Sequence, residues 1–123
     1  FPLIPAGGHR VVPDQPYLSA KRVFLVDAAT MSSGETALGA VAALNLGPIV
    51  GAPSAGTNGN FNEFEIPGWI NVRFTGMRVT DLDGVLLHGK GIAPTIPIEP
   101  TREGIAAGKD ELLLRALEAL HEP

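Results

Sequence analysis

Two adjacent serines stand where an apolar segment meets an alanine-rich one, and their position is the best in the chain for chemistry. Residues 24–30 read Phe-Leu-Val-Asp-Ala-Ala-Thr, and Ser32, Ser33 and Glu35 follow within five positions. A serine in the first turn of a helix faces backbone N–H groups that lack a partner inside the helix, and such groups can stabilise an oxyanion. The pattern is typical of acyl-transfer enzymes with a serine nucleophile.

The same residues also fit a purely structural interpretation. Ser-Ser-Gly-Glu at 32–35 is a capping box, in which Ser32 is the N-cap and Glu35 reaches back to its N–H. For the motif taken alone this is the simpler interpretation, because capping boxes are a common start signal of helices. The choice between a helix cap and a nucleophile therefore depends on the other segments of the chain.

Residues 51–60 resemble two further motifs and complete neither. Gly51 and Gly56 have the glycine spacing of a phosphate-binding loop, but the Lys-Ser/Thr pair that must follow is missing. Ser54 lies in a segment similar to a nucleophile elbow, yet no helical pattern comes after it. Neither motif therefore predicts a site.

Histidines and cysteines limit the other chemistries. The chain has no cysteine, which excludes disulfides, thiolate zinc sites and cysteine nucleophiles. Its three histidines, His9, His88 and His121, are scattered and lack the spacing of metal ligands. We therefore expect no metal and no cofactor.

The composition is that of one folded domain. In 123 residues, 45% are hydrophobic and 18% charged, which is enough apolar material for a core. With a net charge of −4 and no basic cluster, a nucleic-acid partner is not expected. No apolar run approaches the roughly 18 residues of a membrane span. Because the chain opens on Phe1 without a targeting signal, it is either processed or a piece of a longer protein, and we favour the piece.

The elements around the serines predict a β-α-β unit. Residues 21–27 form a nearly continuous apolar run, which favours a strand buried on both faces of a parallel sheet. Residues 33–46 have a helical pattern that Gly47 and Pro48 close, and a second strand begins at Ile49. Residues 1–20, rich in proline and glycine, are expected to be an extended lead-in or linker.

The second half of the chain changes to a period of two. Apolar residues alternate from Phe61 to Val79, which predicts antiparallel strands with a turn at Pro67-Gly68. A short strand is expected at 96–98. The last element is a helix over 111–121, with Asp110 as its N-cap.

Five of these segments, in this order, resemble the C-terminal processing (tail-specific) serine peptidases, a family that includes the tricorn core proteases. They are residues 26–30, 32–35, 49–56, 89–94 and 108–113. Each motif alone is modest, but five in register are specific. The resemblance covers about residues 21–120, and it implies that 21–123 is the C-terminal half of the catalytic domain. It also implies an α/β fold: a Clp-protease/crotonase-like β-α-β core with an added antiparallel strand region and a C-terminal helix.

The resemblance also assigns roles. The family nucleophile, the first serine of Ser-x-x-Glu, falls on Ser32, and the oxyanion N–H just after it is that of Ser33. The implied reaction is hydrolysis of a polypeptide through an acyl-enzyme on Ser32, without a cofactor.

The general base departs from the family pattern. The lysine of the processing branch falls on Thr57, which cannot act as a base near neutral pH. The tricorn-like branch takes a histidine from an upstream part that this chain does not match. His88 lies near the position where that branch has an acidic orienting residue. It is either an ordinary half-exposed histidine at a strand end or a member of the site.

Two functions remain open at this point. The first is a serine peptidase whose chain is an incomplete part of the catalytic domain, and the second is a non-catalytic binding or interaction module on the same fold. Because a sheet without its upstream strands exposes backbone edges, we expect a homo-oligomer, or complementation by the upstream half. The resemblance to the family is consistent with a secreted or periplasmic location. Because this sequence contains no targeting signal, the compartment stays open.

Overall fold

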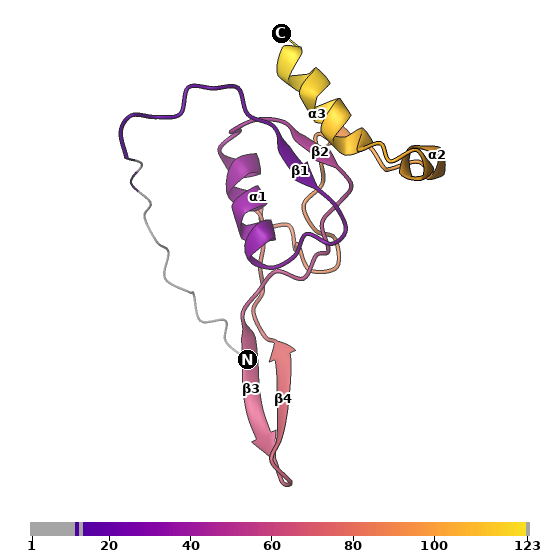
Figure 1. Cartoon of the computed structure of the whole chain (residues 1–123). Coiled ribbons are helices and arrows are strands. Elements are labelled where there is room, and N and C mark those ends of the chain that lie inside the picture. Colours follow the sequence, from indigo (N-terminus) through magenta and orange to yellow (C-terminus); the bar gives the residue numbers. More distant parts are fainter. Residues whose placement is uncertain (1–11, 13, 123) are drawn as a thin grey trace.

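The computed structural model describes residue 12 and residues 14–122 of the chain (Figure 1). Residues 14–20 contain no helix or strand. Most of the remaining lead-in over residues 1–20, His9 included, lies outside the described residues. The boundary between this lead-in and residues 21–123 therefore stays a prediction.

A parallel sheet carries the fold. β1 (Phe24–Val26) leads through α1 (Ser33–Ala43) into β2 (Ile49–Gly51), and β1 and β2 are parallel, which confirms the predicted β-α-β unit. β5 (Ile96–Pro97) lies parallel on the other side of β2, so the strand order is β1-β2-β5. The strand expected over 21–27 is thus shortened to three residues.

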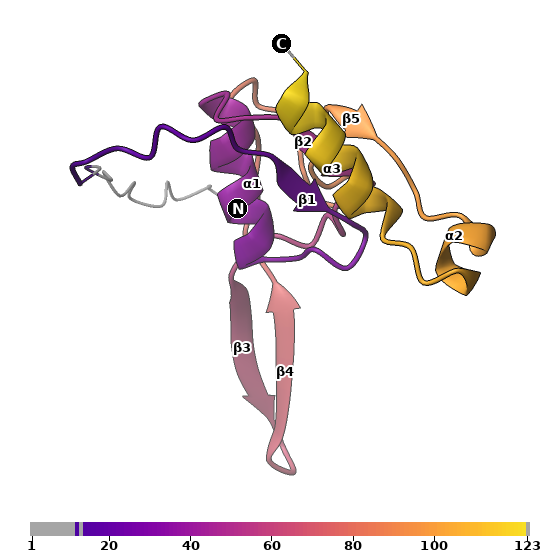
Figure 2. The same cartoon turned by 45° about the horizontal axis from the view of Figure 1, so that its top comes forward.

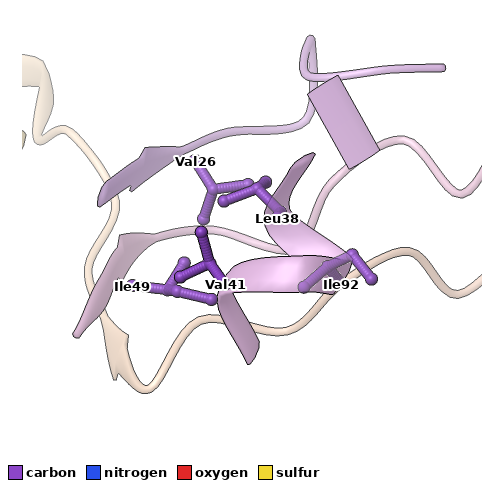
Figure 3. Packing of buried hydrophobic residues seen from close by; sticks show 5 residues of the cluster. All are labelled: Val26, Leu38, Val41, Ile49 and Ile92. Atoms are coloured by element: carbon purple, nitrogen blue, oxygen red, sulfur yellow. The ribbon is translucent and has the colours of Figure 1, made fainter. Parts of the chain in front are cut away.

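Helices cover the two faces of this sheet. Val26 and Ile49 share one face, where α1 packs, and the buried cluster there consists of Val26, Leu38, Val41, Ile49 and Ile92 (Figure 3). Leu25 and Val50 are in register and point to the opposite face, because neighbouring residues of a strand alternate. On that side α3 (Glu111–His121) packs against β1 and β2, so β1 lies between α1 and α3 (Figure 2).

The expectation that residues 21–27 are buried on both faces is wrong at Leu25. Its side chain is 46% exposed, whereas Val26 is buried. Among the described strands β1 pairs only with β2, so it forms an edge of the sheet. On the α3 side a groove stays open beside Leu25, lined also by Leu113 and Leu117. The apolar run therefore predicted the strand correctly, but it did not predict that Leu25 on the α3 side would be exposed.

α1 ends three residues earlier than the pattern over 33–46 predicts. The helix stops at Ala43, because Asn45 adopts a left-handed backbone with φ of 49°. The Leu46 N–H then donates to the Val41 carbonyl at 3.0 Å, which satisfies one of the free carbonyls at the helix end.

The period-two region forms a hairpin that projects from the core (Figures 1 and 2). β3 (Phe61–Ile66) and β4 (Ile70–Thr75) are antiparallel, which confirms the turn at Pro67-Gly68. The strand expected around Met77 and Val79 is wrong, because among the described residues the only pairing there is an isolated bridge between Thr80 and Leu86. Alternation alone did not distinguish a paired segment from an extended one.

The C-terminal region contains one unexpected helix and one predicted one. α2 (Arg102–Ala106) is short, and the Thr101 hydroxyl caps it by accepting from the Gly104 N–H at 2.9 Å. α3 has the predicted bounds and the predicted N-cap, since the Asp110 carboxylate accepts from the Leu113 N–H at 2.9 Å.

Candidate active site

The turn between β1 and α1 holds Ser32 in an unusual backbone conformation. The Asp27 carboxylate shapes the turn by accepting from the N–H groups of Ala29 at 3.0 Å and Thr30 at 2.9 Å. Ser32 follows with φ of 51° and ψ of −115°, a region that favours glycine. Such a conformation costs a serine on the order of 1–3 kcal/mol and is found most often at functional sites. The residue is exposed.

The hydrogen bonds at the start of α1 leave one donor next to Ser32. The Ser32 N–H donates to the Glu35 carboxylate at 3.1 Å, and the Gly34 N–H donates to the Met31 carbonyl at 3.0 Å. Within the described part of the chain, the Ser33 N–H has no acceptor. The capping-box arrangement of Ser32 and Glu35 is present, but the Ser32 hydroxyl forms no cap hydrogen bond of normal geometry. Both the hydroxyl and the adjacent Ser33 N–H are thus available to a ligand.

Glu35 fastens this turn to a second loop. Its side chain is buried, with 2% exposed, and its Oε1 accepts from the Ser54 hydroxyl at 2.6 Å and the Gly56 N–H at 2.7 Å. Its Oε2 accepts from the Thr57 N–H at 3.0 Å in addition to the Ser32 N–H. A single carboxylate therefore joins the serine turn to residues 54–57.

The hydrogen bonds keep Glu35 ionised. Burial alone raises the pKa of this carboxyl group, because it disfavours the charged form. The donors from Ser54, Gly56, Thr57 and Ser32 outweigh the burial, so the pKa of Glu35 lies below its ordinary value. Near neutral pH the group is a fixed negative charge that orients four donors.

A third segment, residues 89–92, packs on the same loop. The Gly89 N–H donates to the Gly56 carbonyl at 2.8 Å, and the Ser54 hydroxyl accepts from the Ile92 N–H at 2.7 Å. A side chain at Gly56 would come within 2.8 Å of backbone nitrogens of residues 90 and 91. Gly56 and Gly91 are therefore required for the close backbone contact between the two segments.

A cleft of about 650 Å³ lies beside this cluster. One wall comes from α1 and includes Thr36, Gly39 and Ala40, whose side chains are small, and the other comes from residues 79–83. Glu35 and Thr36 border the cleft, so it begins within about one helical turn of Ser32.

The described residues contain no group of three or more acidic or histidine side chains that could hold a metal ion. In the same part of the chain, every helix is too short or too polar to cross a membrane.

The comparisons with known proteins agree with this arrangement. The sequence profile of peptidase family S41 matches residues 10–98. The chain belongs to this family. A comparison with functionally curated proteins finds no match.

Solved structures of S41-like peptidases have the same fold. A candidate peptidase from Parabacteroides merdae superimposes with a TM-score of 0.80 at 22% identity, over 89% of this chain and 35% of that one. The tricorn protease gives a TM-score of 0.68 at 17% identity, over 92% of this chain and 12% of that one. The photosystem II D1 C-terminal processing protease gives 0.58 at 24% identity, over 83% and 24%. These likenesses confirm the Clp-protease-like α/β fold, and the chain spans about a third or less of each of them.

In this S41 chain, three of the motif segments, residues 32–35, 49–56 and 89–94, lie together. The candidate His88 forms no contact with Ser32 among the hydrogen bonds of the described residues. Ser32 and Ser33 lie in the turn that Glu35 holds. His88 is exposed and directly precedes Gly89, whose N–H binds Gly56. Among the described residues no hydrogen bond joins the His88 ring to the Ser32 hydroxyl. The role of His88 therefore stays a prediction.

Sequence reasoning missed the roles of Glu35 and Ser54 in this S41 chain. The capping box indicated only the contact of Glu35 with Ser32, and Ser54 was considered only as a weak nucleophile candidate. The structure buries Ser54 and directs its hydroxyl to Glu35 at 2.6 Å. The usable signal was a glutamate in an apolar helix, opposite a loop of serine and glycine.

Proposed function

We propose that this chain carries the nucleophile and part of the oxyanion hole of a serine peptidase, with Ser32 as the nucleophile. The observation that carries the proposal is the left-handed backbone of Ser32, at φ of 51°, beside the unpaired Ser33 N–H. An N-cap serine has no need of this strain, because N-caps ordinarily use the extended region. Strain at an exposed serine is characteristic of a nucleophile on a sharp strand-to-helix turn.

The reaction that fits these groups is acyl transfer to Ser32. The Ser32 Oγ bonds to the carbonyl carbon of a peptide while its proton passes to a general base, and the Ser33 N–H donates to the oxyanion. The base then protonates the leaving amine, and the C–N bond breaks to leave an ester on Ser32. Water hydrolyses this ester, with the same base as proton acceptor, and restores the hydroxyl.

The proposal assigns the base to a histidine. His88 is the candidate within this chain, because its neighbour Gly89 contacts the loop that Glu35 holds. The resemblance to the tricorn-like branch offers the alternative, a histidine from an upstream part of the catalytic domain. The two alternatives differ in whether this chain activates Ser32 by itself.

The substrate of the proposed enzyme is a polypeptide. The cleft beside α1 supports this, since the small side chains of Gly39 and Ala40 leave room for a substrate side chain near Ser32. A pocket of several hundred Å³ is of the size that binds a small ligand or a few residues of a peptide.

Labelling with a fluorophosphonate, mapped by mass spectrometry, tests the nucleophile. We expect one adduct on Ser32, absent from Ser32→Ala and retained in Ser33→Ala, because Ser33 acts through its backbone. If His88 is the base, His88→Ala loses the adduct and His121→Ala keeps it. An adduct that persists in Ser32→Ala contradicts Ser32 as the nucleophile. An unlabelled wild-type chain means that the base lies upstream of this chain or that the chain is a binding module, and labelling of an upstream-extended chain separates these two outcomes.

A second variant separates the nucleophile from the cap. Ser32→Gly should lose the adduct yet unfold at the same or a higher urea concentration, because glycine accepts the backbone at φ of 51° without strain. If Ser32 were only a cap, both Ser32→Ala and Ser32→Gly would leave any labelling of the chain unchanged.

A further inference from the structure

The register of the β3–β4 hairpin divides its side chains into two unlike faces. Residues opposite each other in an antiparallel pair lie on the same face. One face contains the pairs Asn62–Phe74, Phe64–Val72 and Ile66–Ile70, and the other contains Phe61–Thr75, Glu63–Arg73 and Glu65–Asn71. The first set is called the apolar face below, and the second the polar face.

Side-chain contacts agree with this division. On the apolar face the rings of Phe64 and Phe74 meet edge to face, with centroids 6.1 Å apart. On the polar face Arg73 pairs with Glu63 and lies over the Phe61 ring, 5.1 Å from its centroid. The polar face thus contains one ion pair within the hairpin, whereas the contacts found on the apolar face are between its own side chains.

Nothing in the described chain covers the apolar face. Phe64 and Phe74 are each 50% exposed, Ile70 is 55% exposed, and Trp69 at the tip is 86% exposed. Figures 1 and 2 show the hairpin extending away from both helices of the core. A two-stranded hairpin alone is marginally stable in water, and a contiguous exposed apolar patch marks an interaction site.

We propose that the apolar face of the hairpin binds the same face of a second copy of this chain, related by a two-fold axis. The face has no charged side chain, so two copies meet without like-charge repulsion, although the whole chain has a net charge of −4. A two-fold interface requires a surface that is complementary to itself. An axis near the central Phe64–Val72 pair places the tip of one hairpin against the base of the other.

The available area is sufficient for a specific dimer of modest affinity. Since a fully buried aromatic side chain contributes about 150–250 Å², the exposed parts of this face and of Trp69 provide on the order of 500 Å² per copy. Two copies then bury on the order of 1,000 Å², which is near the lower limit for a specific interface. We therefore expect a dimer that dissociates on dilution.

Adjacent substitutions on opposite faces test the interface by sedimentation equilibrium. Ile70→Asp puts a charge on the apolar face, and Asn71→Asp puts the same charge on the polar face. Ile70 is more than half exposed, so its replacement removes little packing within the chain. We expect the wild-type chain and Asn71→Asp to form dimers and Ile70→Asp to have the mass of one chain. A wild-type chain that stays monomeric over the whole concentration range overturns the proposal, whatever else covers the face.

Cysteine cross-linking gives a second test that does not depend on disrupting the hairpin. The chain has no cysteine, so a single substitution reports one position. Val72→Cys lies near the proposed axis and should form a disulfide-linked dimer under mild oxidation, whereas Asn71→Cys should stay monomeric. Equal cross-linking of both variants, or cross-linking of Asn71→Cys alone, contradicts the proposed face.

Discussion

The serine turn and the β3–β4 hairpin are both built from loops and short elements, but they are stabilised in opposite ways. Around Glu35, one buried carboxylate accepts four hydrogen bonds and joins the serine turn to residues 54–57. Residues 89–92 bind in turn to Ser54 and Gly56, so three segments far apart in sequence meet there. The hairpin is a local structure whose contacts are almost entirely between its own two strands. The first region is held by hydrogen bonds between segments of the described chain, and the second presents apolar side chains that the described chain leaves exposed.

The difference shows why a strained turn and an exposed hairpin impose different demands on a sequence. The strained backbone of Ser32 persists only because the surrounding hydrogen bonds determine it. The hairpin needs only an amphipathic alternation and a turn, so its stability is expected to depend on what binds it. Substitutions near Glu35 should therefore affect folding of the chain, and those in the hairpin mainly association.

Glu35→Ala should give the largest effect on stability. It leaves the buried Ser54 hydroxyl and Gly56 N–H without an acceptor, which should cost about 3–6 kcal/mol. The matched control is Glu63→Ala in the hairpin, where an exposed ion pair with Arg73 contributes about 1 kcal/mol or less. Urea unfolding followed by far-UV circular dichroism measures both, since Trp69, the single tryptophan, is too exposed to report on the core. Equal losses in the two variants would remove the contrast between the regions.

Sequence patterns predicted the secondary-structure elements and their turns and caps well, but not the contacts of Glu35 with a distant loop. The Pro67-Gly68 turn and the Asp110 cap depend on neighbours within a few residues. The parallel pairing of β1 with β2 spans 25 positions, but it follows from the default topology of a β-α-β unit once its elements are recognised. The Glu35 cluster depends on contacts with residues 54–57, which are 19 to 22 positions away in sequence. The capping box is satisfied by the contact of Glu35 with the Ser32 N–H alone, so the motif gave no sign of the contacts with residues 54–57.

The sequence patterns also did not predict which strands have partners and which apolar side chains are buried. The alternation from Phe61 to Val79 indicated strands but not that the third segment would lack a partner. The apolar run at 21–27 indicated a strand but not the exposure of Leu25, which depends on how far α3 reaches. The short helix α2 was missed because five residues are too few for a periodic pattern.

Two glycines with left-handed backbones give a second, smaller contrast. Gly91 has φ of 71°, and a Cβ there would overlap the Ser54 carbonyl oxygen and come within 2.8 Å of its carbonyl carbon. Gly68 at the hairpin tip has φ of 97° and its nearest neighbour at 3.9 Å. Gly91→Ala should therefore cost about 2–5 kcal/mol, from backbone strain and overlap together. Gly68→Ala should cost about 1–2 kcal/mol from strain alone.

Urea midpoints of the two alanine variants check this difference. The backbone penalty is common to both, so the excess at Gly91 measures the close packing of residues 89–92 on Ser54. A loss at Gly68 as large as that at Gly91 would contradict the tight contact between the two loops.

Acid should weaken the Glu35 cluster selectively, and this is the smallest effect expected. The pKa of Glu35 is lowered in the folded chain, so the stability it contributes is fully present above the ordinary glutamate pKa of about 4.3. That contribution falls as the pH drops through this value toward the lower folded pKa, at about 1.4 kcal/mol per unit of difference. Glu35→Gln removes the titration, so its urea midpoint should change less between pH 5 and pH 3 than that of the wild-type chain. An equal change of midpoint in Glu35→Gln and in the wild-type chain would mean that Glu35 does not titrate as its four donors require.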